Sequence, residues 1–223
     1  MFSGFKKTLE DAGYHVSWQI AKCEMFGVPQ KRRRLVVVAS KVALPPQLSP
    51  THQKPLTVKD AIANLPATTA GASAVGDPLH IAASLSDTNL RRIQASKPGG
   101  TWRDWPFELR AKCHQKSSGK TYSGVYARMV WDAPSPTMTT QCYGYGNGRF
   151  GHPEQDRAIT LREAAILQSF PANYSFLPAG DKPNISEIGR WIGNAVPVGL
   201  AQAIGDCIGS LIEEHRVGTR TYA

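Results

Sequence analysis

Residues 27–39 read GVPQKRRRLVVVA, and this stretch decides the fold class. Its second part, residues 35–39, is a short β-branched run without polar alternation, which is typical of a strand buried on both faces in an α/β sheet. Residues 14–20 alternate apolar and polar side chains, which predicts a second strand with one buried face. Residues 3–12 are followed by Gly13, which predicts a short helix that ends in a glycine cap. Because two strands alone make no stable sheet, we expect the chain to pair with another polypeptide or to be a fragment of an α/β domain.

Composition describes a basic globular protein. The 223 residues are 41% hydrophobic and carry a formal charge of +9, which excludes a disordered chain and favours a polyanionic partner. A solvated basic surface explains the charge equally well. The four cysteines have no C-x-x-C spacing, so a zinc site is not expected. The N-terminus lacks the apolar core of a signal peptide and the apolar runs are short, so we predict a cytoplasmic, nucleoid-associated protein without membrane contact.

Helix-start signals mark the rest of the chain. Thr57–Asp60 and Thr160–Glu163 both have the S/T-x-x-D/E form that caps a helix N-terminus. Pro197 stands where another helix would begin, followed by an apolar stripe at helical spacing: Ala201, Ile204, Ile208 and Leu211. Residues 67–78 predict a loop and residues 138–143 a strand, whereas the elements within residues 79–127 are not predicted.

Three segments in this order carry a family resemblance. They are GVPQKRRR at 27–34, then PTMTT at 136–140 with RAITLREAAILQSFP at 157–171, and finally IGNAVP at 192–197. Together they resemble the closing motifs of DNA cytosine-5 methyltransferases, and the resemblance runs from about residue 5 to about residue 210. Residues 41–127 occupy the place of that family's variable target-recognition region.

The family must turn a cytosine out of the DNA helix and hold its polar edge, and a planar guanidinium suits a carbonyl oxygen or a phosphate. Arg32 and Arg34 alternate on a segment that enters a strand, so they should point the same way. The resemblance implies that Arg34 contacts the flipped cytosine and that Arg32 holds the DNA backbone or the local loop. Gln30 looks like the first residue of this motif. Without the other motifs, a basic run beside a hydrophobic strand would be the preferred interpretation.

The resemblance also implies a part of the S-adenosyl-L-methionine site. Gly193, Asn194 and Ala195 lie just ahead of the predicted helix at Pro197, and a helix N-terminus favours an anionic group such as a carboxylate. By themselves these residues would be an ordinary turn and cap. The missing part of the enzyme would bind most of the cofactor.

Double-stranded DNA is the expected partner. Candidate DNA contacts, chosen from the resemblance or from charge and loop character, are Gln30, Arg128, Thr137, Thr139, Lys116 and Lys120, with Ser117 as a further possibility. Trp102 and Trp105 are interpreted as core residues in preference to base-stacking ones. Within 160–171, Arg162, Glu163, Leu167 and Phe170 are interpreted as structural.

The sequence lacks other parts of the family pattern. No Pro-Cys pair occurs for the loop that holds the nucleophilic cysteine, and the Glu-Asn-Val and F-x-G-x-G motifs are absent as well. All of these precede residue 1 in the family's order, which indicates truncation. We therefore expect this chain to be inactive alone and to act with a separate N-terminal methyltransferase subunit. A non-enzymatic DNA-binding or regulatory module and an inert fragment are the alternatives.

The predicted architecture is α/β in three parts. Residues 1–44 are the end of a Rossmann-like catalytic sheet domain, 45–185 a small, irregular, mostly β target-recognition domain, and 186–223 a helix that returns to the first domain. The first and last parts should then touch, with the DNA cleft between the two lobes. No metal site is expected.

Overall fold

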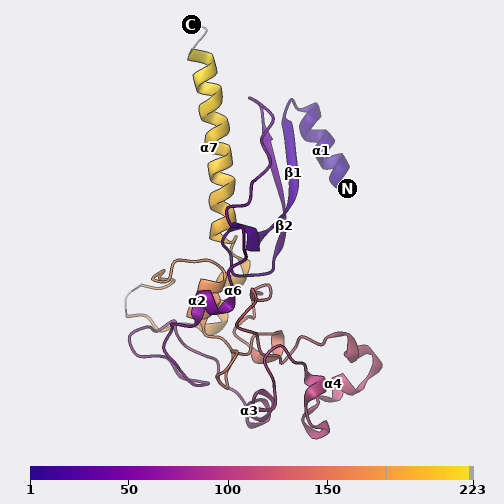
Figure 1. Cartoon of the computed structure of the whole chain (residues 1–223), viewed down its shortest axis with the longest axis vertical. Coiled ribbons are helices and arrows are strands. Elements are labelled where there is room, and N and C mark those ends of the chain that lie inside the picture. The colour runs from indigo at the N-terminus through magenta and orange to yellow at the C-terminus, as the bar shows by residue number, and fades with distance from the viewer. Residues whose placement is uncertain (179, 221–223) are drawn as a thin grey trace.

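The fold consists of a two-stranded sheet, a long C-terminal helix and an irregular part between them (Figure 1). This irregular part, residues 41–197, is called the lower body below. This computed structural model describes residues 1–178 and 180–220, without the side chains of Lys120 and of 217–220. The strands are β1 (His15–Lys22) and β2 (Arg33–Ser40). The α-helices are α1 (Phe2–Asp11), α2 (Val58–Ile62), α3 (Asp87–Gln94), α4 (Lys112–Gln115), α5 (Leu161–Leu167), α6 (Ile185–Asn194) and α7 (Val198–Arg220). The 3-10 turns are η1 (Cys23–Phe26), η2 (Trp102–Asp104), η3 (Phe107–Leu109), η4 (Ser117–Thr121) and η5 (Tyr145–Asn147).

The predicted N-terminal elements are confirmed. α1 is followed by Gly13 at φ 82°, a left-handed conformation that glycine adopts at no steric cost. β1 and β2 pair antiparallel, with Trp18 opposite Val37 and Ala21 opposite Arg34. Directly opposite residues share a face of the sheet, so these two pairs define its two faces.

Burial of β2 on both faces is a prediction that the structure contradicts. One face packs Val36 and Val38 against α7. On the other face, Trp18, Ile20 and Leu35 are each 45–56% exposed. Near Trp18 this face is covered by Phe2 of α1, whose ring meets the indole edge-on at 5.1 Å. The β-branched run thus has the composition of a two-sided core strand, but this chain covers only one side of it.

The C-terminal helix α7 packs on the N-terminal sheet. α7 begins directly after Pro197 and lies along β1 and β2 (Figure 1). Its buried side chains are Leu200, Ala203 and Leu211, with Ile204 and Cys207 packed beside them. The predicted stripe is rotated slightly from this face, because Ala201 and Ile208 are exposed.

The lower body is organised around α5. Thr160 caps this helix through a complete capping box with Glu163, as predicted, and nearly every residue of the helix is buried. α2 packs against α5 and has its own capping box between Thr57 and Asp60, also as predicted. The helix is shorter than expected because it ends at Ile62, four residues ahead of Pro66.

The prediction of a mostly β lower body is wrong. Within the described residues, both strands lie at 15–40, and the lower body contributes isolated bridges such as Ser73 with Ile81 and Gly151 with Ala158. Residues 138–143, predicted as a strand, form loop and turn. Frequent Gly and Pro explain this, since both residues interrupt strand ladders.

Three α-helices were not foreseen as separate elements, namely α3, α4 and α6. α3 begins at the N-cap Ser86, and α6 begins at the N-cap Asn184, whose side chain accepts from two backbone amides. α6 contributes Ile188 and Ile192 to the core around α5. It therefore packs with the lower body, whereas the predicted boundary at 186 assigned it to the returning segment.

The stretch Ile185–Arg216 joins α6 and α7 and is long and apolar enough to cross a membrane by length and composition, because it contains an 18-residue window with a mean hydropathy of 1.5. This is weak evidence, because a helix that packs inside a globular fold passes the same test. Pro197 also breaks the stretch, and the face of α7 around Leu200 packs on the sheet.

Candidate functional site

A cavity of about 530 Å³ lies where β2 meets the junction of α6 and α7. Its lining comes from two distant segments, residues 32–37 and residues 193–204. Arg32 and Arg34 both face it, as do Gly193, Asn194 and Ala195. The structure thus brings the predicted cytosine-contacting and cofactor-contacting residues into one cavity.

Arg32 is held firmly but incompletely. The residue is only 7% exposed. Its Nη1 donates to the carbonyl of Met138 at 3.0 Å and to Gln30 Oε1 at 3.4 Å. Nε is buried and has no hydrogen-bond partner. Since an unpaired buried donor is costly, this guanidinium is suited to donate to one more oxygen.

Arg34 lies two residues further along and is exposed. Its Nη1 donates to the carbonyl of Arg33 at 2.8 Å. It shares the sheet face of Ala21, whereas Arg33 pairs with Lys22 on the opposite face. Arg32 and Arg34 therefore point the same way, as the alternation along the strand predicted.

Gly193 packs closely against the backbone of the loop at Thr139 and Thr140. A side chain at Gly193 would collide with the backbone of these two threonines, so glycine is required for this close approach. Gln168 Nε2 donates to the carbonyl of Ala195 at 2.7 Å. Asn194 ends α6 and is exposed, and three residues separate it from Val198, where α7 starts. The predicted position just ahead of a helix N-terminus is thus only approximate.

The placement of Gln30 argues against its predicted contact with DNA. The residue is 0% exposed, and its amide nitrogen donates to Gln168 Oε1 at 2.7 Å and to the Leu167 carbonyl at 3.2 Å. Its amide oxygen accepts from the backbone of Met138 at 3.1 Å. Gln30 therefore joins three segments of the fold, and a DNA contact would require breaking these bonds.

Arg128 is likewise used within the fold. It is 4% exposed and donates to the backbone carbonyls of Ile93 and His152, both at 2.9 Å, and of Gln155 at 2.6 Å. It also forms an ion pair with Asp156. With its donors already engaged, Arg128 does not fit the predicted contact with phosphate.

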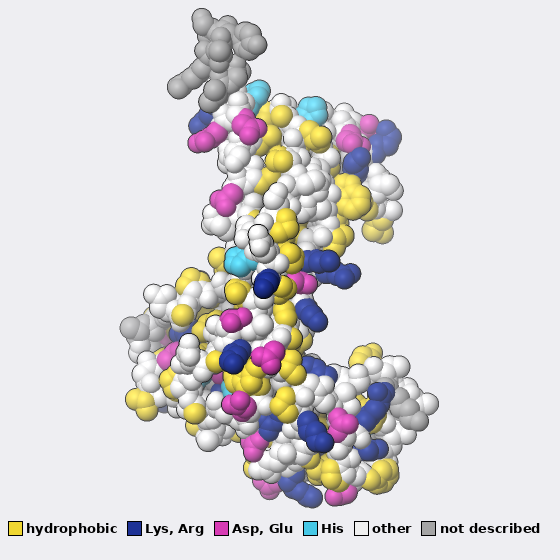
Figure 2. All heavy atoms as spheres, viewed as in Figure 1, with side chains coloured by type: hydrophobic (Ala, Val, Ile, Leu, Met, Phe, Trp, Pro, Cys, Tyr) yellow, Lys and Arg dark blue, Asp and Glu magenta, His cyan; other side chains and the backbone are white. Residues whose placement is uncertain are grey.

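The other DNA candidates are accessible. Thr137, Thr139, Lys116 and Ser117 are exposed. Two further basic residues, Lys31 and Arg33, are exposed as well and were not predicted as DNA contacts. The side chain of Lys120 lies outside the described part of the chain. Figure 2 shows a hollow between the part with β1 and β2 and the part with α4, with Lys and Arg side chains along it. Lys22 and Arg33 face each other directly in the sheet, an arrangement of like charges that an anion would relieve.

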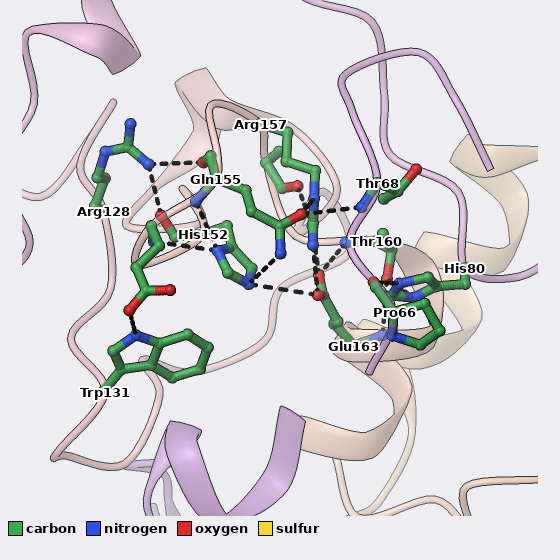
Figure 3. A network of polar contacts seen from close by, with 12 residues as sticks. Pro66, Thr68, His80, Arg128, Trp131, His152, Gln155, Arg157, Thr160 and Glu163 are labelled. Atoms are coloured by element: carbon green, nitrogen blue, oxygen red, sulfur yellow. Dashed lines mark hydrogen bonds and ion pairs between the residues drawn. The ribbon is translucent and has the colours of Figure 1, made fainter. Parts of the chain in front are cut away.

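The buried polar network around α5 has a structural role (Figure 3). Arg157 Nη1 and Nη2 each donate to one oxygen of Glu163 at 2.7 Å, and the backbone of Thr160 donates to the same carboxylate at 2.7 Å. His80 bonds Thr160 Oγ1 at 3.0 Å and the Pro66 carbonyl at 2.7 Å. The network confirms that Glu163 caps its helix.

Two pKa values show how this network is balanced. Burial raises the pKa of Glu163, but the hydrogen bonds and charge of Arg157 outweigh burial and leave the pKa below its usual value. Burial lowers the pKa of His152 to about 4, against an opposing effect of Glu163. His152 Nδ1 accepts from the backbone amides of Glu154 and Gln155, so its imidazole is neutral near pH 7.

The thiols offer no activated nucleophile among the described residues. Burial raises the pKa of Cys142 to about 12 and also raises the pKa of Cys23, although Arg34 partly opposes the latter shift. A thiol that stays protonated is a poor nucleophile. Cys113 is exposed and Cys207 donates to the Pro46 carbonyl. In the described residues no group of three His, Cys, Asp or Glu side chains could hold a metal ion.

Trp102 and Trp105 are core residues, as predicted. They are 4% and 2% exposed and pack with Leu109. Trp105 Nε1 donates to Ser96 Oγ at 2.8 Å. Neither indole is available for stacking on a base.

Comparisons with known proteins agree with the residue pattern. Residues 1–210 match the family model of C-5 cytosine-specific DNA methylases. The Type II methylase M.HgiDII of Herpetosiphon aurantiacus is 52% identical over 96% of this chain and 60% of its own length. The Type II methyltransferase M.PspPI of Psychrobacter sp. (strain TA137) is 35% identical over 91% of this chain and 48% of its own length. The chain thus spans about half to 60% of these relatives.

A solved structure shows the same fold. It is described as a DNA modification methyltransferase encoded within a prophage (E. coli), and it matches with a TM-score of 0.67 at 19% identity. The match covers 95% of this chain and 66% of that one. From the family match over residues 1–210, the chain belongs to the C-5 cytosine-specific DNA methylase family.

Proposed function

We propose that this chain is the C-terminal part of a DNA cytosine-5 methyltransferase. It binds double-stranded DNA and forms one wall of the pockets for the flipped cytosine and for S-adenosyl-L-methionine. The attacking cysteine comes from a separate N-terminal part. The observation that carries this proposal is the cavity that unites Arg32 and Arg34 with Asn194 and Ala195.

Within this cavity the two arginines have different roles. Arg34, which is exposed at the cavity wall, donates to the polar edge of the everted cytosine. Arg32 holds the loop at Met138 through its 3.0 Å bond and positions Arg34 by fixing the start of β2.

The cavity also fits one edge of the cofactor. Beside the amide of Asn194 it has apolar walls from Val36, Leu200 and Ile204, a combination that suits a nucleoside-like molecule with polar ends. Asn194 and Ala195 would hold this edge, and Gly193 keeps them in place by its contact with Thr139 and Thr140. S-adenosyl-L-methionine supplies the methyl group when bound.

DNA contacts fall on exposed polar and basic side chains, and the hollow in Figure 2 has Lys and Arg side chains along it. Thr137 and Thr139 offer hydroxyls for phosphate, although Thr137 Oγ1 also donates to the Lys31 carbonyl at 2.8 Å. Lys31, Arg33 and Lys116 add positive charge. Gln30 and Arg128 are left out because their polar atoms bond within the fold.

An N-terminal partner is supported by the sheet. Ile20 and Leu35, with the part of Trp18 that Phe2 leaves exposed, present an apolar surface, and such a surface marks an interaction site. M.HgiDII extends beyond the matched region by about 40% of its length, enough to supply a covering layer and the nucleophile. The raised pKa values of Cys23 and Cys142 leave these thiols unsuited to that role.

Transfer of a tritiated methyl group from S-adenosyl-L-methionine to unmethylated phage DNA tests the proposal. We expect no turnover by the chain alone and clear turnover after addition of a polypeptide equivalent to the part of M.HgiDII that lies outside the matched region. Robust turnover by the isolated chain would refute the need for a partner. Salt-sensitive DNA binding with no turnover in the mixture would favour a non-enzymatic DNA-binding module.

A further inference from the structure

Residues 101–124, here called the α4 lobe, project sideways from the lower body (Figure 1). Their core is the cluster of Trp102, Trp105 and Leu109. Trp102 Nε1 donates to the Tyr122 carbonyl at 2.9 Å, which ties the two ends of the lobe together. The lobe therefore has a fixed shape of its own, although few regular elements build it.

The α4 lobe contains a cavity of about 470 Å³. It is lined by Trp102, Arg103, Phe107, Arg110, His114 and Gln115. The rings of Trp102 and His114 stack with centroids 4.4 Å apart and planes inclined by 19°. Phe107 is 69% exposed. The cavity thus combines flat aromatic surfaces with two guanidinium groups, and no carboxylate belongs to its lining.

His114 is the least satisfied group in this lining. The residue is 5% exposed, and its Nδ1 is buried without a hydrogen-bond partner. Burial lowers the pKa of His114, and the charge of Arg92 lowers it further, so the imidazole is neutral near pH 7. A neutral ring offers one donor and one acceptor, which matches a base edge better than a phosphate.

Arg110 is held in place as a planar donor. Its Nη2 donates to the carbonyls of Arg103 at 2.6 Å and Trp105 at 3.1 Å, and its Nε also donates to Trp105 at 3.2 Å. These bonds fix the guanidinium plane at the cavity wall. Because Nε and Nη2 are engaged in these bonds, Nη1 is the nitrogen that can donate to an acceptor of guanine in the major groove, beside the donor that the neutral His114 ring offers.

We propose that the α4-lobe cavity reads the major-groove edge of a guanine near the target cytosine, with Arg110 and His114 as the reading residues and Phe107 packing on the base. This inference rests on the proposed DNA binding of the chain. It names a specificity determinant within the region whose base contacts the sequence did not disclose.

Selection from a randomised pool of DNA duplexes tests this proposal with the full chain. We expect the wild-type chain to enrich one guanine position. Arg110→Lys keeps the charge and His114→Phe keeps the ring on Trp102, so each should reduce that preference about tenfold or more while the salt dependence of binding stays unchanged. Phe107→Ala, at an exposed position that cannot disturb the core, should also weaken the preference.

Lys116→Ala is the matched control, because Lys116 is exposed in the same lobe but does not line the cavity. It should weaken binding to all duplexes equally and lower the salt slope by about one unit. Equal weakening of all sequences by the Arg110, His114 and Phe107 variants would indicate a phosphate site and overturn the proposal. So would an unchanged preference, or binding without any base preference. Failure of the wild-type chain to bind DNA at all would refute the proposed function as well.

Discussion

Two regions of the molecule hold buried arginines, and the surroundings of these arginines differ. Around α5, Arg157 meets both oxygens of Glu163 at 2.7 Å and has its charge fully matched. Beside β2, Arg32 is held by neutral oxygens and keeps an unpaired Nε. An arginine with every donor engaged stabilises the fold, whereas an arginine short of acceptors has capacity left for a ligand. We therefore expect mutations around α5 to lower the stability of the fold, and mutations beside β2 to affect ligand binding and methyl transfer.

Glu163→Gln should produce the largest loss of stability. The substitution leaves the charge of Arg157 buried without its partner, which costs about 3–5 kcal/mol in the free energy of unfolding. Chemical denaturation of the two proteins measures the difference. The matched control is Glu10→Gln, which removes a surface pair with Lys6 and should cost less than about 1 kcal/mol. Similar losses for both variants would remove the distinction between buried and surface pairs.

Acid should destabilise the same region through His152. The unfolded chain binds a proton on this histidine below its ordinary pKa of 6.5, whereas the folded chain binds it only near pH 4. Protonation therefore favours the unfolded state, and stability should fall by about 3 kcal/mol as the pH drops from 6.5 to 4. Protonation of Glu163 acts in the same direction at lower pH, because its pKa is also lowered.

Unfolding measured across this pH range checks the histidine contribution. His152→Asn retains an acceptor for the backbone amides of Glu154 and Gln155 but cannot titrate, so its stability should depend less steeply on pH. The exposed His15→Asn serves as control and should keep the wild-type slope. An unchanged slope in His152→Asn would show that other groups govern the acid response.

Gly193→Ala should cause a smaller loss of stability, at the point where the cavity lining contacts the loop at Thr139 and Thr140. The new methyl group would collide with the backbone of Thr139 and Thr140, and overpacking of this kind costs about 1–3 kcal/mol. Gly205→Ala in α7 is the matched control, since nothing lies within 4 Å of the added carbon. It should stabilise the helix by up to about 1 kcal/mol. Thermal unfolding of both variants tests whether Gly193 is required for close packing.

Local signals in the sequence predicted much of this fold. The capping boxes at Thr57 and Thr160 marked α2 and α5, and Gly13 marked the end of α1. A similar signal at Asn184, followed by Glu187 three residues later, was present but missed, and it begins α6. Such signals are readable because each depends on bonds within one turn of helix.

Longer-range packing could not be predicted from the sequence in the same way. Gln30 and Arg128 have the residue types of DNA contacts, yet their partners lie more than twenty residues away and bury them. The alternation of Arg32 and Arg34 predicted that they share a face, but only the tertiary fold shows which loop they meet. The partly exposed sheet face at Trp18 could not be predicted either, because composition alone does not show what covers a strand.

The most direct test of the account compares Arg34→Ala with Arg33→Ala in the chain supplemented with its N-terminal partner. The two arginines are adjacent and exposed, but only Arg34 faces the cavity. We expect Arg34→Ala to lower methyl transfer roughly 100-fold at an unchanged melting temperature, and Arg33→Ala only to raise the DNA concentration needed. Equal loss of methyl transfer in both variants, or full activity of Arg34→Ala, would contradict this expectation.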